Sequence, residues 1–306
     1  IYNQKWLKEM VNQRCEAAIL EVSSHGLDLH RVEEIDFDLA VFTNLYSDHL
    51  DYHKTLDAYA AAKKKLFQKA KRSILNADSP WSTFMGTGFT FGIEKGDLRA
   101  SHIHLTDRGT DFVIEGCPFH LPLIGRFNIY NGLAAIAVGL QMGGTLTHIS
   151  DIMATFDSVP ARLERVGNVF VDFAHTGEAL ESALQTLKEI ALGRVIVVFG
   201  CGGNRDPRRR TSMAQAADKW ADISIVTLDN PRQEDPQEIV RQILTGFTQP
   251  PSIELDRRKA IFQAIQMADP QDLVLIAGKG HERVQIFAHQ TLPFDDLTVV
   301  KEALVL

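Results

Sequence analysis

Cysteines are scarce in this chain, and long apolar runs are absent. The 306 residues include only Cys15, Cys117 and Cys201, which are too far apart to form a CxxC zinc or redox pair. Few, scattered cysteines are typical of a reducing compartment, so we expect a cytoplasmic protein. No apolar stretch approaches the roughly 20 residues that cross a bilayer, and residues 1–10 lack the apolar core of a secretion signal. We therefore expect no membrane partner.

A net positive charge is also missing. The formal charge is -7 and the isoelectric point is near 5.9. Nucleic acids and anionic lipids bind basic faces, so neither is expected as a partner. Small anionic ligands are compatible with this charge balance, because they need only local positive charge. The chain also lacks an initiator methionine, and we expect it to begin inside a longer gene product.

Apolar patterning predicts an α/β core with a β appendage in the first half of the chain. We expect helices over residues 3–15 and 56–70 and strands over residues 17–23 and 38–45. Further predicted elements are short β-like runs at 89–93, 101–107, 111–116 and 119–125 and helices at 128–142 and 147–157.

From Val159 onward the pattern becomes regular. Apolar strands alternate with amphipathic helices of ten or more residues, which is typical of βαβ units and a largely parallel sheet. The length predicts two domains, and we place them at residues 1–158 and 159–306. The expected strands of the second domain are 169–174, 194–201, 223–229 and 272–278.

Each of these four strands ends in a polar cluster. The clusters read "DFAHT", "GCGGNRD", "LDNPR" and "AGKGHE". In parallel α/β sheets, ligands bind beyond the carboxyl ends of the strands, so the clusters predict a binding site at one edge of the sheet. Turn formation alone is the alternative, because Gly, Asn, Asp and Pro are turn formers. The presence of arginine, histidine or an acidic residue in each of the four clusters weakens that alternative.

The glycine-rich cluster at residues 200–206 permits two further interpretations. It loosely resembles a dinucleotide-binding loop, which would indicate a nicotinamide-dependent oxidoreductase, but it lacks the GxGxxG spacing. Cys201 within the cluster is either a nucleophile or a small residue that fills a tight turn. The sequence favours the turn, because no partner His and acid are evident.

A second candidate site follows two predicted strands of the first half. Glu21 ends one strand and His49 follows the next, so the two side chains could face one another. A carboxylate and an imidazole suit a divalent metal ion, and oxygen ligands favour magnesium. Taken alone, His49 is more often a hydrogen-bonded structural residue, and the ammonium of Lys63 would be repelled by a metal ion.

Nine motifs occur in order along nearly the whole chain: "EVSSHG", "FTNLYSDHLDYH", "YAAAKK", "GRFNIYN", "VPARLERV", "VDFAHT", "GCGGNRD", "DNPR" and "GKGHE". This set strongly resembles the Mur ligases of peptidoglycan synthesis. The resemblance implies a truncated central ATPase-type α/β domain that binds ATP and magnesium, followed by a Rossmann-like βαβ domain that binds the incoming amino acid. The family's ATP-binding glycine loop, GTxGKT, is not found before Glu21, so we expect the chain to be inactive by itself.

The resemblance implies an ATP-dependent amide ligation. ATP phosphorylates the D-glutamate carboxylate of UDP-MurNAc-L-Ala-D-Glu, and the amine of meso-diaminopimelate then attacks the acyl phosphate. Such a reaction needs cations that neutralise the phosphoryl charge and a site that aligns amine and acyl carbon. The implied cofactors are Mg2+ and ATP, the latter as a co-substrate, and we expect a monomer.

The family's functional positions carry over residue by residue. Glu21 and His49 match magnesium ligands, and Lys63 matches a lysine that the family carbamylates, which turns a repelled cation into an anion. These three residues are the implied catalytic set. The implied substrate-binding residues are Ser23, Arg31, Arg205, Asp229, Asn230, Arg232, Gly278 and Glu282, and the implied nucleotide-binding residues are Asn128, Asn131, Arg162 and Asp172.

The motif "DNPR", residues 229–232, carries the implied substrate choice. In the family, arginine at its last position, here Arg232, accompanies meso-diaminopimelate, whose far end has a carboxylate that lysine lacks. A guanidinium can grip a carboxylate with two parallel hydrogen bonds, which is the physical reason to expect selection. Arg205 is a second guanidinium for this purpose, and Glu282 offers an anion to the distal ammonium.

Two alternatives stay open. The first is another ligase of the same superfamily, such as a folylpolyglutamate synthase, which the joint occurrence of "DNPR" and "GKGHE" disfavours. The second is a non-catalytic module that binds an amino acid without ATP chemistry, which the missing glycine loop favours for the chain as given.

Overall fold

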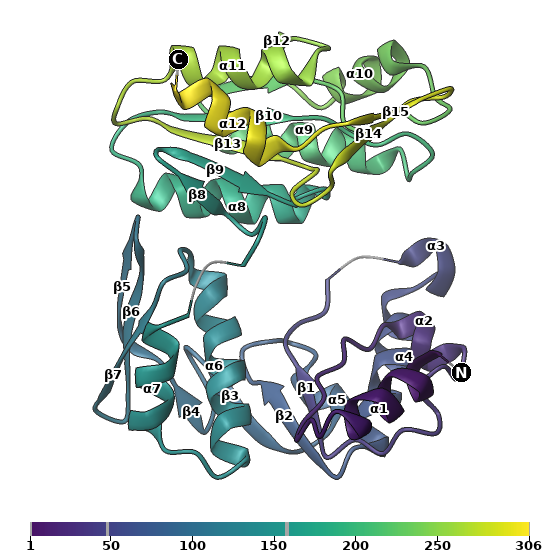
Figure 1. Cartoon of the computed structure of the whole chain (residues 1–306), viewed down its shortest axis with the longest axis vertical. Helices are drawn as coiled ribbons and strands as arrows, with labels where there is room; N and C mark the ends of the chain where they lie inside the picture. Colours follow the sequence, from purple (N-terminus) through teal and green to yellow (C-terminus); the bar gives the residue numbers. More distant parts are fainter. Residues whose placement is uncertain (1, 47–48, 157–158, 306) are drawn as a thin grey trace. The chain divides into compact units, whose positions relative to one another are not determined.

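The computed structural model describes residues 2–46, 49–156 and 159–305 (Figure 1). The chain divides into two compact units, and each is described by itself. The first unit comprises residues 1–103, 111–120 and 128–154, and the second comprises residues 104–110, 121–127 and 155–306. Residue 158, where we predicted the first domain to end, lies outside the described residues, so that boundary stays a prediction.

The first half of the chain contains a four-stranded parallel sheet. Its strands lie in the order β1 (Leu39–Phe42), β2 (Arg72–Asn76), β3 (Phe89–Gly92) and β4 (Leu98–Arg99). A separate sheet of β5 (Ser101–Thr106), β6 (Gly109–Ile114) and β7 (Cys117–Leu121) is the expected β appendage. The helices are α1 (Tyr2–Asn12), α2 (Ser24–Asp28), α3 (Leu50–His53), α4 (Leu56–Lys69), α5 (Ser82–Met85), α6 (Arg126–Gln141) and α7 (Leu146–Ala154).

Helix α4 shows how local sequence fixes an element that carries a candidate residue. Thr55 caps the helix, and its hydroxyl accepts a hydrogen bond from the Ala58 amide at 3.1 Å. The negative charge of Asp57 in the first turn interacts favourably with the positive end of the helix dipole. The buried face places Tyr59 and Ala60 in a core cluster with β1 and β2. Lys63 lies one turn after Tyr59, so the packing of this helix also fixes the position of the Lys63 backbone.

The strand predicted over residues 17–23 does not form, so that prediction is wrong. Residues 17–22 have no regular secondary structure, and the Ile19 side chain is 97% exposed. Apolar, β-branched composition makes a strand only where a neighbouring strand accepts its hydrogen bonds. Within the described residues 2–46, β1 is the only strand, and its single partner is β2.

The second unit contains a six-stranded sheet in the order β12-β11-β10-β13-β9-β8. All neighbours are parallel except β8 and β9, which are antiparallel. A two-stranded antiparallel hairpin, β14 with β15, follows β13. The strands are β8 (Glu164–Val166), β9 (Val169–Asp172), β10 (Val195–Phe199), β11 (Ile223–Val226), β12 (Ser252–Ile253), β13 (Leu273–Ala277), β14 (Val284–Ile286) and β15 (Thr291–Pro293).

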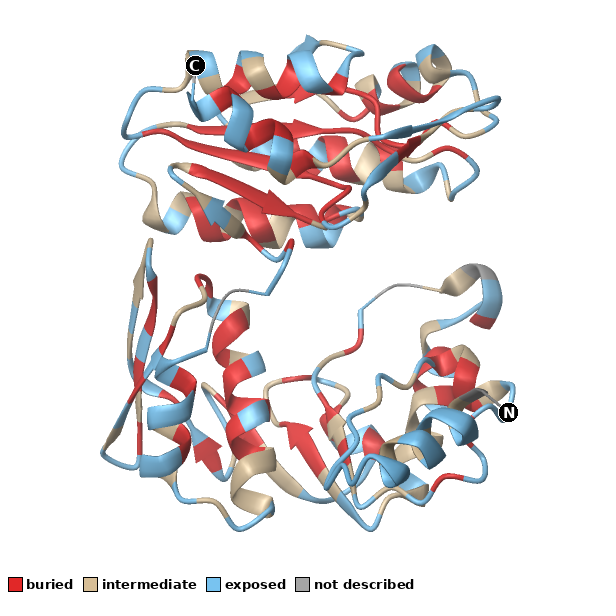
Figure 2. Ribbon diagram, in the orientation of Figure 1, coloured by how far each residue is buried: buried red, intermediate tan, exposed pale blue. Residues whose placement is uncertain are grey.

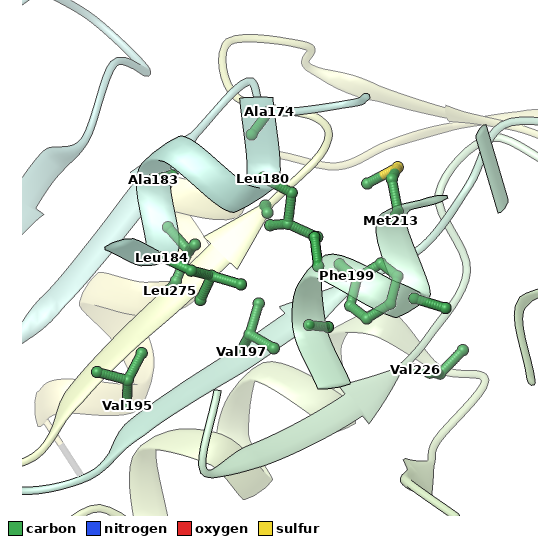
Figure 3. Packing of buried hydrophobic residues seen from close by; sticks show 14 of the residues in the cluster. Ala174, Leu180, Ala183, Leu184, Val195, Val197, Phe199, Met213, Val226 and Leu275 are labelled. Carbon is green, nitrogen blue, oxygen red and sulfur yellow. The ribbon is translucent and has the colours of Figure 1, made fainter. Parts of the chain in front are cut away.

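Helices cover both faces of this sheet, and the central strands are buried along their whole length (Figure 2). Helices α8 (Gly177–Ile190), α9 (Arg208–Trp220) and α10 (Pro236–Leu244) pack on one face. Figure 3 shows the contact there, with Leu180 and Met213 against Val197 and Phe199. Helices α11 (Arg257–Met267) and α12 (Asp296–Val305) pack on the other face. Burial on both faces explains why these strands read as continuous apolar runs.

The expected βαβ architecture of the second half is therefore confirmed. Strands β9, β10, β11 and β13 all lie within the four predicted ranges. Among the described residues, none of the helices combines the length and the apolar character that a bilayer crossing requires.

Candidate functional site

A cavity of about 140 Å³ lies at the carboxyl ends of four parallel strands in the second unit. Its lining residues are Phe173 and His175 after β9; Gly200, Cys201, Gly202, Arg205, Asp206, Arg209 and Arg210 after β10; Asp229, Asn230 and Arg232 after β11; and Gly278 and Glu282 after β13. All four polar clusters contribute, because parallel strands end at the same edge of a sheet.

The six residues that we expected to contact the amino acid all line this cavity: Arg205, Asp229, Asn230, Arg232, Gly278 and Glu282. These six residues bring two guanidinium groups and two carboxyl groups to one small volume. Their roles toward a ligand stay predictions.

Asn230 and Glu282 are joined directly in the cavity wall. The Asn230 amide Nδ2 donates to Glu282 Oε2 at 2.6 Å. Lys279, whose side chain is completely buried, donates to Asn230 Oδ1 at 3.1 Å and to Glu282 Oε2 at 3.2 Å. The sequence assigned no role to this lysine, and its position between two glycines directly after a buried strand was the available signal.

Asp229 and Cys201 are two buried lining residues whose pKa values are shifted. Burial raises the pKa of the Asp229 carboxyl, which the positive charges of Arg257 and Lys279 oppose. Burial likewise raises the pKa of the Cys201 thiol to about 12, and its Sγ lies 3.6 Å from Met213 Sδ. A thiol that stays protonated is a poor nucleophile, so the geometry supports the turn-filling interpretation of Cys201.

Arg232 holds an uncommon backbone conformation beside the cavity. Its φ is 55°, in the left-handed region, and its amide donates to the Ile286 carbonyl at 3.0 Å. Its Nη1 donates to the Gly203 carbonyl at 2.8 Å. Gly203 must be glycine, because a Cβ there would lie 1.9 Å from the Pro231 carbonyl oxygen. The loops after β10 and β11 are therefore interlocked around the arginine.

Arg210 connects these two loops through hydrogen bonds to Gly202 and Glu234. Its side chain is 2% exposed, and its Nη2 donates to Glu234 Oε2 at 2.8 Å. Its Nη1 donates to Gln242 Oε1 at 2.6 Å. Three adjacent arginines begin α9, and sequence alone does not reveal that only this one is buried.

Asp172 and Arg162 lie at the end of β9 and in the segment before β8. Both Asp172 oxygens accept backbone amides, from Leu163 at 2.8 Å and Ala174 at 2.7 Å, and burial raises the pKa of this carboxyl. The Arg162 guanidinium lies 5.4 Å from the centre of the Phe173 ring. Asp172 therefore fixes the turn after β9, and its proposed contact with ribose would use lone pairs that remain.

His175 offers a proton acceptor at the cavity. Its Nδ1 lies 2.8 Å from the Phe173 carbonyl oxygen, which can only accept, so Nδ1 carries the proton. In the neutral ring, Nε2 is then the unprotonated nitrogen.

Asn128 and Asn131 lie on α6 in the first unit, where the Asn131 amide Nδ2 donates to Asn128 Oδ1 at 3.0 Å. Asn128 is buried and Asn131 is exposed. Arg162 and Asp172 belong to the second unit, so the two halves of the expected nucleotide site are described separately.

The expected magnesium residues also belong to the first unit. Lys63 Nζ lies 3.4 Å from the Val22 carbonyl oxygen and 5.9 Å from the centre of the Tyr59 ring. The His49 ring centroid lies 5.8 Å from that of Tyr59. Burial lowers the pKa of the Lys63 amine, and the charge of Glu21 opposes this shift. Lys63 and His49 therefore both lie near the Tyr59 ring, and Lys63 is close enough to Glu21 to feel its charge.

Within residues 2–46, 49–156 and 159–305, the side chains of His, Cys, Asp and Glu form no group of three that could hold a metal ion. If Glu21 and His49 are ligands as predicted, a third ligand would have to come from another residue type. Lys63 fits this need only as a carbamate, because an ammonium repels a divalent cation.

Ser23 and Arg31 flank α2. The Ser23 hydroxyl accepts the Gly26 amide at 3.0 Å as the helix cap, and Arg31 is exposed. Both residues are on the first unit with Glu21.

Comparison with known proteins covers both units. The Mur ligase middle domain model matches residues 1–139, and the Mur ligase, glutamate ligase domain model matches residues 161–280. The chain is 44% identical over 322 residues to the UDP-N-acetylmuramoyl-L-alanyl-D-glutamate–2,6-diaminopimelate ligase of Chlamydia caviae, which covers 98% of this chain and 66% of that relative. The ligase of the same name from Bacillus velezensis is 42% identical, covering 99% and 67%.

Solved structures give the same picture. A structure of a UDP-N-acetylmuramoyl-L-alanyl-D-glutamate–2,6-diaminopimelate ligase has a TM-score of 0.64 and 35% identity, covering 94% of this chain and 64% of that one. Folylpolyglutamate synthase of Mycobacterium tuberculosis has a TM-score of 0.67 at 20% identity, covering 80% and 62%, which shows a shared fold alone. The chain spans about 66% of the length of the first curated relatives that it matches.

Proposed function

Because the chain belongs to the Mur ligase family, we propose that it carries out the ATP-dependent addition of meso-diaminopimelate to UDP-MurNAc-L-Ala-D-Glu. The names of the Chlamydia and Bacillus relatives support this choice of substrates. The same proposal makes it a monomeric enzyme of the cytoplasm that acts on soluble nucleotide-linked precursors.

One observation carries the proposal: Arg205, Arg232 and Glu282 line the same small cavity. A diamino diacid has an ammonium and a carboxylate at each end, so it needs a site with both kinds of partner close together. L-lysine lacks the distal carboxylate and would leave a guanidinium without an anion. Unpaired polar groups in a small site penalise the wrong substrate strongly.

We assign the amino acid to the second unit and the UDP-linked dipeptide to the first, while the residues proposed for ATP occur in both units. In this scheme Ser23 and Arg31 contact the UDP-linked dipeptide, and Asn128 and Asn131 contact adenine. Arg162 and Asp172, from the second unit, contact phosphate and ribose. Amides, guanidinium and carboxylate suit these three partners respectively.

Mg2+ would be held by Glu21, His49 and carbamylated Lys63. The donor set fits a hard divalent ion once Lys63 becomes an anion, and the lowered pKa of its amine favours the neutral form that reacts with carbon dioxide. When bound, the ion neutralises charge on the phosphates of ATP.

In the reaction, an oxygen of the D-glutamate carboxylate displaces ADP from the γ-phosphorus, and the amine nitrogen then displaces phosphate from the acyl carbon. The incoming ammonium must lose a proton before it attacks. The residues of the cavity bind and orient the amino acid, so that attack becomes effectively unimolecular. In this proposal Asp229 and Glu282 bind its ammonium groups and Arg205 and Arg232 bind its carboxylates, which is supported by the position of all four residues in the lining of one cavity.

The test has two arms. On this chain, meso-diaminopimelate is expected to raise the melting temperature more than L-lysine does at equal concentration. In a chimera where this chain replaces the matching two thirds of the Chlamydia caviae relative, ADP release is expected only with the dipeptide substrate and meso-diaminopimelate both present. A chimera that folds, binds ATP and ligates L-lysine as well as meso-diaminopimelate would refute the proposed specificity.

A further inference from the structure

Lys279 is completely buried behind the amino-acid cavity: it is not a lining residue, but it binds two lining residues, Asn230 and Glu282. Its ammonium donates to the Val284 carbonyl at 2.6 Å, to Asn230 Oδ1 at 3.1 Å and to Glu282 Oε2 at 3.2 Å. An ammonium has three protons, so its donor capacity is fully used. A buried charge with complete pairing is held in one geometry.

These bonds determine which way the Asn230 amide points. The atom that faces Lys279 also accepts the Ile286 backbone amide at 2.9 Å, so it must be the carbonyl oxygen. The nitrogen end of the amide is consequently directed to Glu282 Oε2, at 2.6 Å. Rotating the amide by half a turn would place an NH2 group against two donors.

The two carboxylate oxygens of Glu282 therefore have different hydrogen-bond environments. Its Oε2 accepts from both Asn230 and Lys279, whereas no donor to Oε1 is found within residues 159–305. The Glu282 side chain is 33% exposed and lines the cavity. Oε1 is therefore the oxygen that a ligand can use.

Lys279 also joins the cavity wall to the hairpin. It binds the Val284 carbonyl on β14, Ile286 of the same strand binds Asn230, and Arg232 donates its amide to the Ile286 carbonyl. One buried ammonium thus connects the loops after β11 and β13 with β14.

We propose that Lys279 is a positioning residue: it locks the Asn230 amide and the Glu282 carboxylate so that Glu282 Oε1 receives an ammonium of the incoming diamino acid. Lys279 itself does not touch the ligand. This inference rests on the proposed function for its ligand, while the locked geometry exists without one.

The experiment uses Lys279→Met and Lys279→Gln, with Lys188→Met as the matched control. Lys188 makes one ion pair with Asp222 outside the cavity, at 2.5 Å. In the chimera, Lys279→Met is expected to raise the KM for meso-diaminopimelate by about tenfold or more, with kcat and the KM for ATP nearly unchanged. Lys279→Gln, which keeps donors, is expected to fall between Met and the parent, and the control to match the parent.

A double-mutant comparison with Glu282→Gln distinguishes this positioning role from a purely structural one. If Lys279 acts through Glu282, the rise in KM should shrink to less than about twofold when Glu282→Gln is already present. The proposal would be overturned if Lys279→Met raised the KM by the same factor with and without Glu282→Gln. An unchanged KM in folded Lys279→Met would also overturn it.

A measurement on the ligand-free chain separates this inference from the proposed function. Hydrogen exchange of the Ile286 amide, which Asn230 Oδ1 accepts, should be slow in the parent and faster in Lys279→Gln, while amides of β10 stay unchanged. Should Lys279→Met fail to fold, side-chain NMR of parent Asn230 still decides: a freely exchanging, averaged NH2 contradicts the lock. Failure of ligation with an intact lock would count against the proposed function alone.

Discussion

Arg257 and Asp296 form an ion pair in which both side chains are completely buried. Nε and Nη2 of Arg257 lie 2.8 and 2.7 Å from the two Asp296 oxygens, and Nη2 also donates to the Ala277 carbonyl at 3.0 Å. The pair joins the first residues of α11 and α12 beneath the residue that precedes Gly278. Arg257 Nη1 is buried and has no hydrogen-bond partner among residues 2–46, 49–156 and 159–305.

Breaking this pair should be costly, because a buried charge would remain without compensation. Asp296→Ala is expected to lower the free energy of unfolding by about 3–5 kcal/mol, measured by urea denaturation of this chain. The matched control is Glu302→Ala, which removes the exposed pair between Arg258 and Glu302 on the same two helices and should cost less than about 1 kcal/mol. Equal losses in the two variants would contradict the role of burial.

Arg232→Asn should remove the preference for meso-diaminopimelate over L-lysine without unfolding the second unit. Asparagine tolerates the left-handed backbone at φ 55° better than most residues, so the loop should keep its shape. The loss of the guanidinium should reduce the ratio of the two affinities by roughly tenfold or more, measured by calorimetry. Arg241→Asn, on the exposed face of α10, is the control that should leave the ratio unchanged.

Gly278→Ala tests the close approach of the backbone to Asp229. Gly278 has φ +112°, and a Cβ there would lie 2.9 Å from Asp229 Oδ2. Gly143, at φ +93°, has nothing within 4 Å of such a Cβ. Gly143→Ala should therefore report backbone strain alone, about 1 kcal/mol, and Gly278→Ala should cost about 1–3 kcal/mol more. Similar melting temperatures for the two variants would show that the Asp229 side chain moves aside freely.

Lys63 should carry a carbamate. With 13C-labelled bicarbonate, the chain is expected to give a carbamate carbon resonance that disappears in Lys63→Arg and persists in Lys64→Arg, whose ammonium lies over the Phe84 ring. The signal should fall as pH decreases, because carbon dioxide adds only to the neutral amine, and burial already lowers the pKa of this amine. A resonance that survives in Lys63→Arg would place the modification elsewhere.

Asp272 should make the free energy of unfolding depend on pH in the acidic range. It accepts the Arg194 amide at 2.6 Å, Nε at 2.9 Å and Nη2 at 2.5 Å, and these bonds lower the pKa of the Asp272 carboxyl to about 2. Because the pKa is lower in the folded state than its ordinary 3.8, the stabilisation is complete above pH 3.8 and is lost as pH falls toward 2.

Asp272→Asn is therefore expected to cost about 1–2 kcal/mol at pH 7, discounted because Arg194 is 43% exposed, and almost nothing near pH 2. Urea denaturation across this range measures the difference.

The regular part of the fold could be read from the sequence because its determinants are local. Helix α4 is specified by its cap and its apolar spacing, and β10 by a run of five buried apolar residues. The strand expected over residues 17–23 failed for a non-local reason: composition alone cannot show whether a neighbouring strand is available.

The same distinction applies to the site. The four polar clusters that form it could be predicted because each follows a strand and parallel strands end together, whereas the individual residues came from the family resemblance. The supporting charges could not, since the burial of Lys279, Arg210 and Arg257 depends on packing between segments distant in sequence. The motif "GKGHE" marks Lys279 as unusual, but only the three bonds of its ammonium indicate what it does.

The cavity draws almost nothing from the hydrophobic layers that hold its sheet together. Within residues 159–305, Cys201 is the only lining residue that belongs to the core cluster under α8, α9 and α10, and the cluster under α11 and α12 contributes none. Substitutions in the strand-end loops and the β14–β15 hairpin would therefore change the ligand that the cavity accepts while the scaffold stays intact. Evolvability of substrate choice is in this sense a property of the architecture.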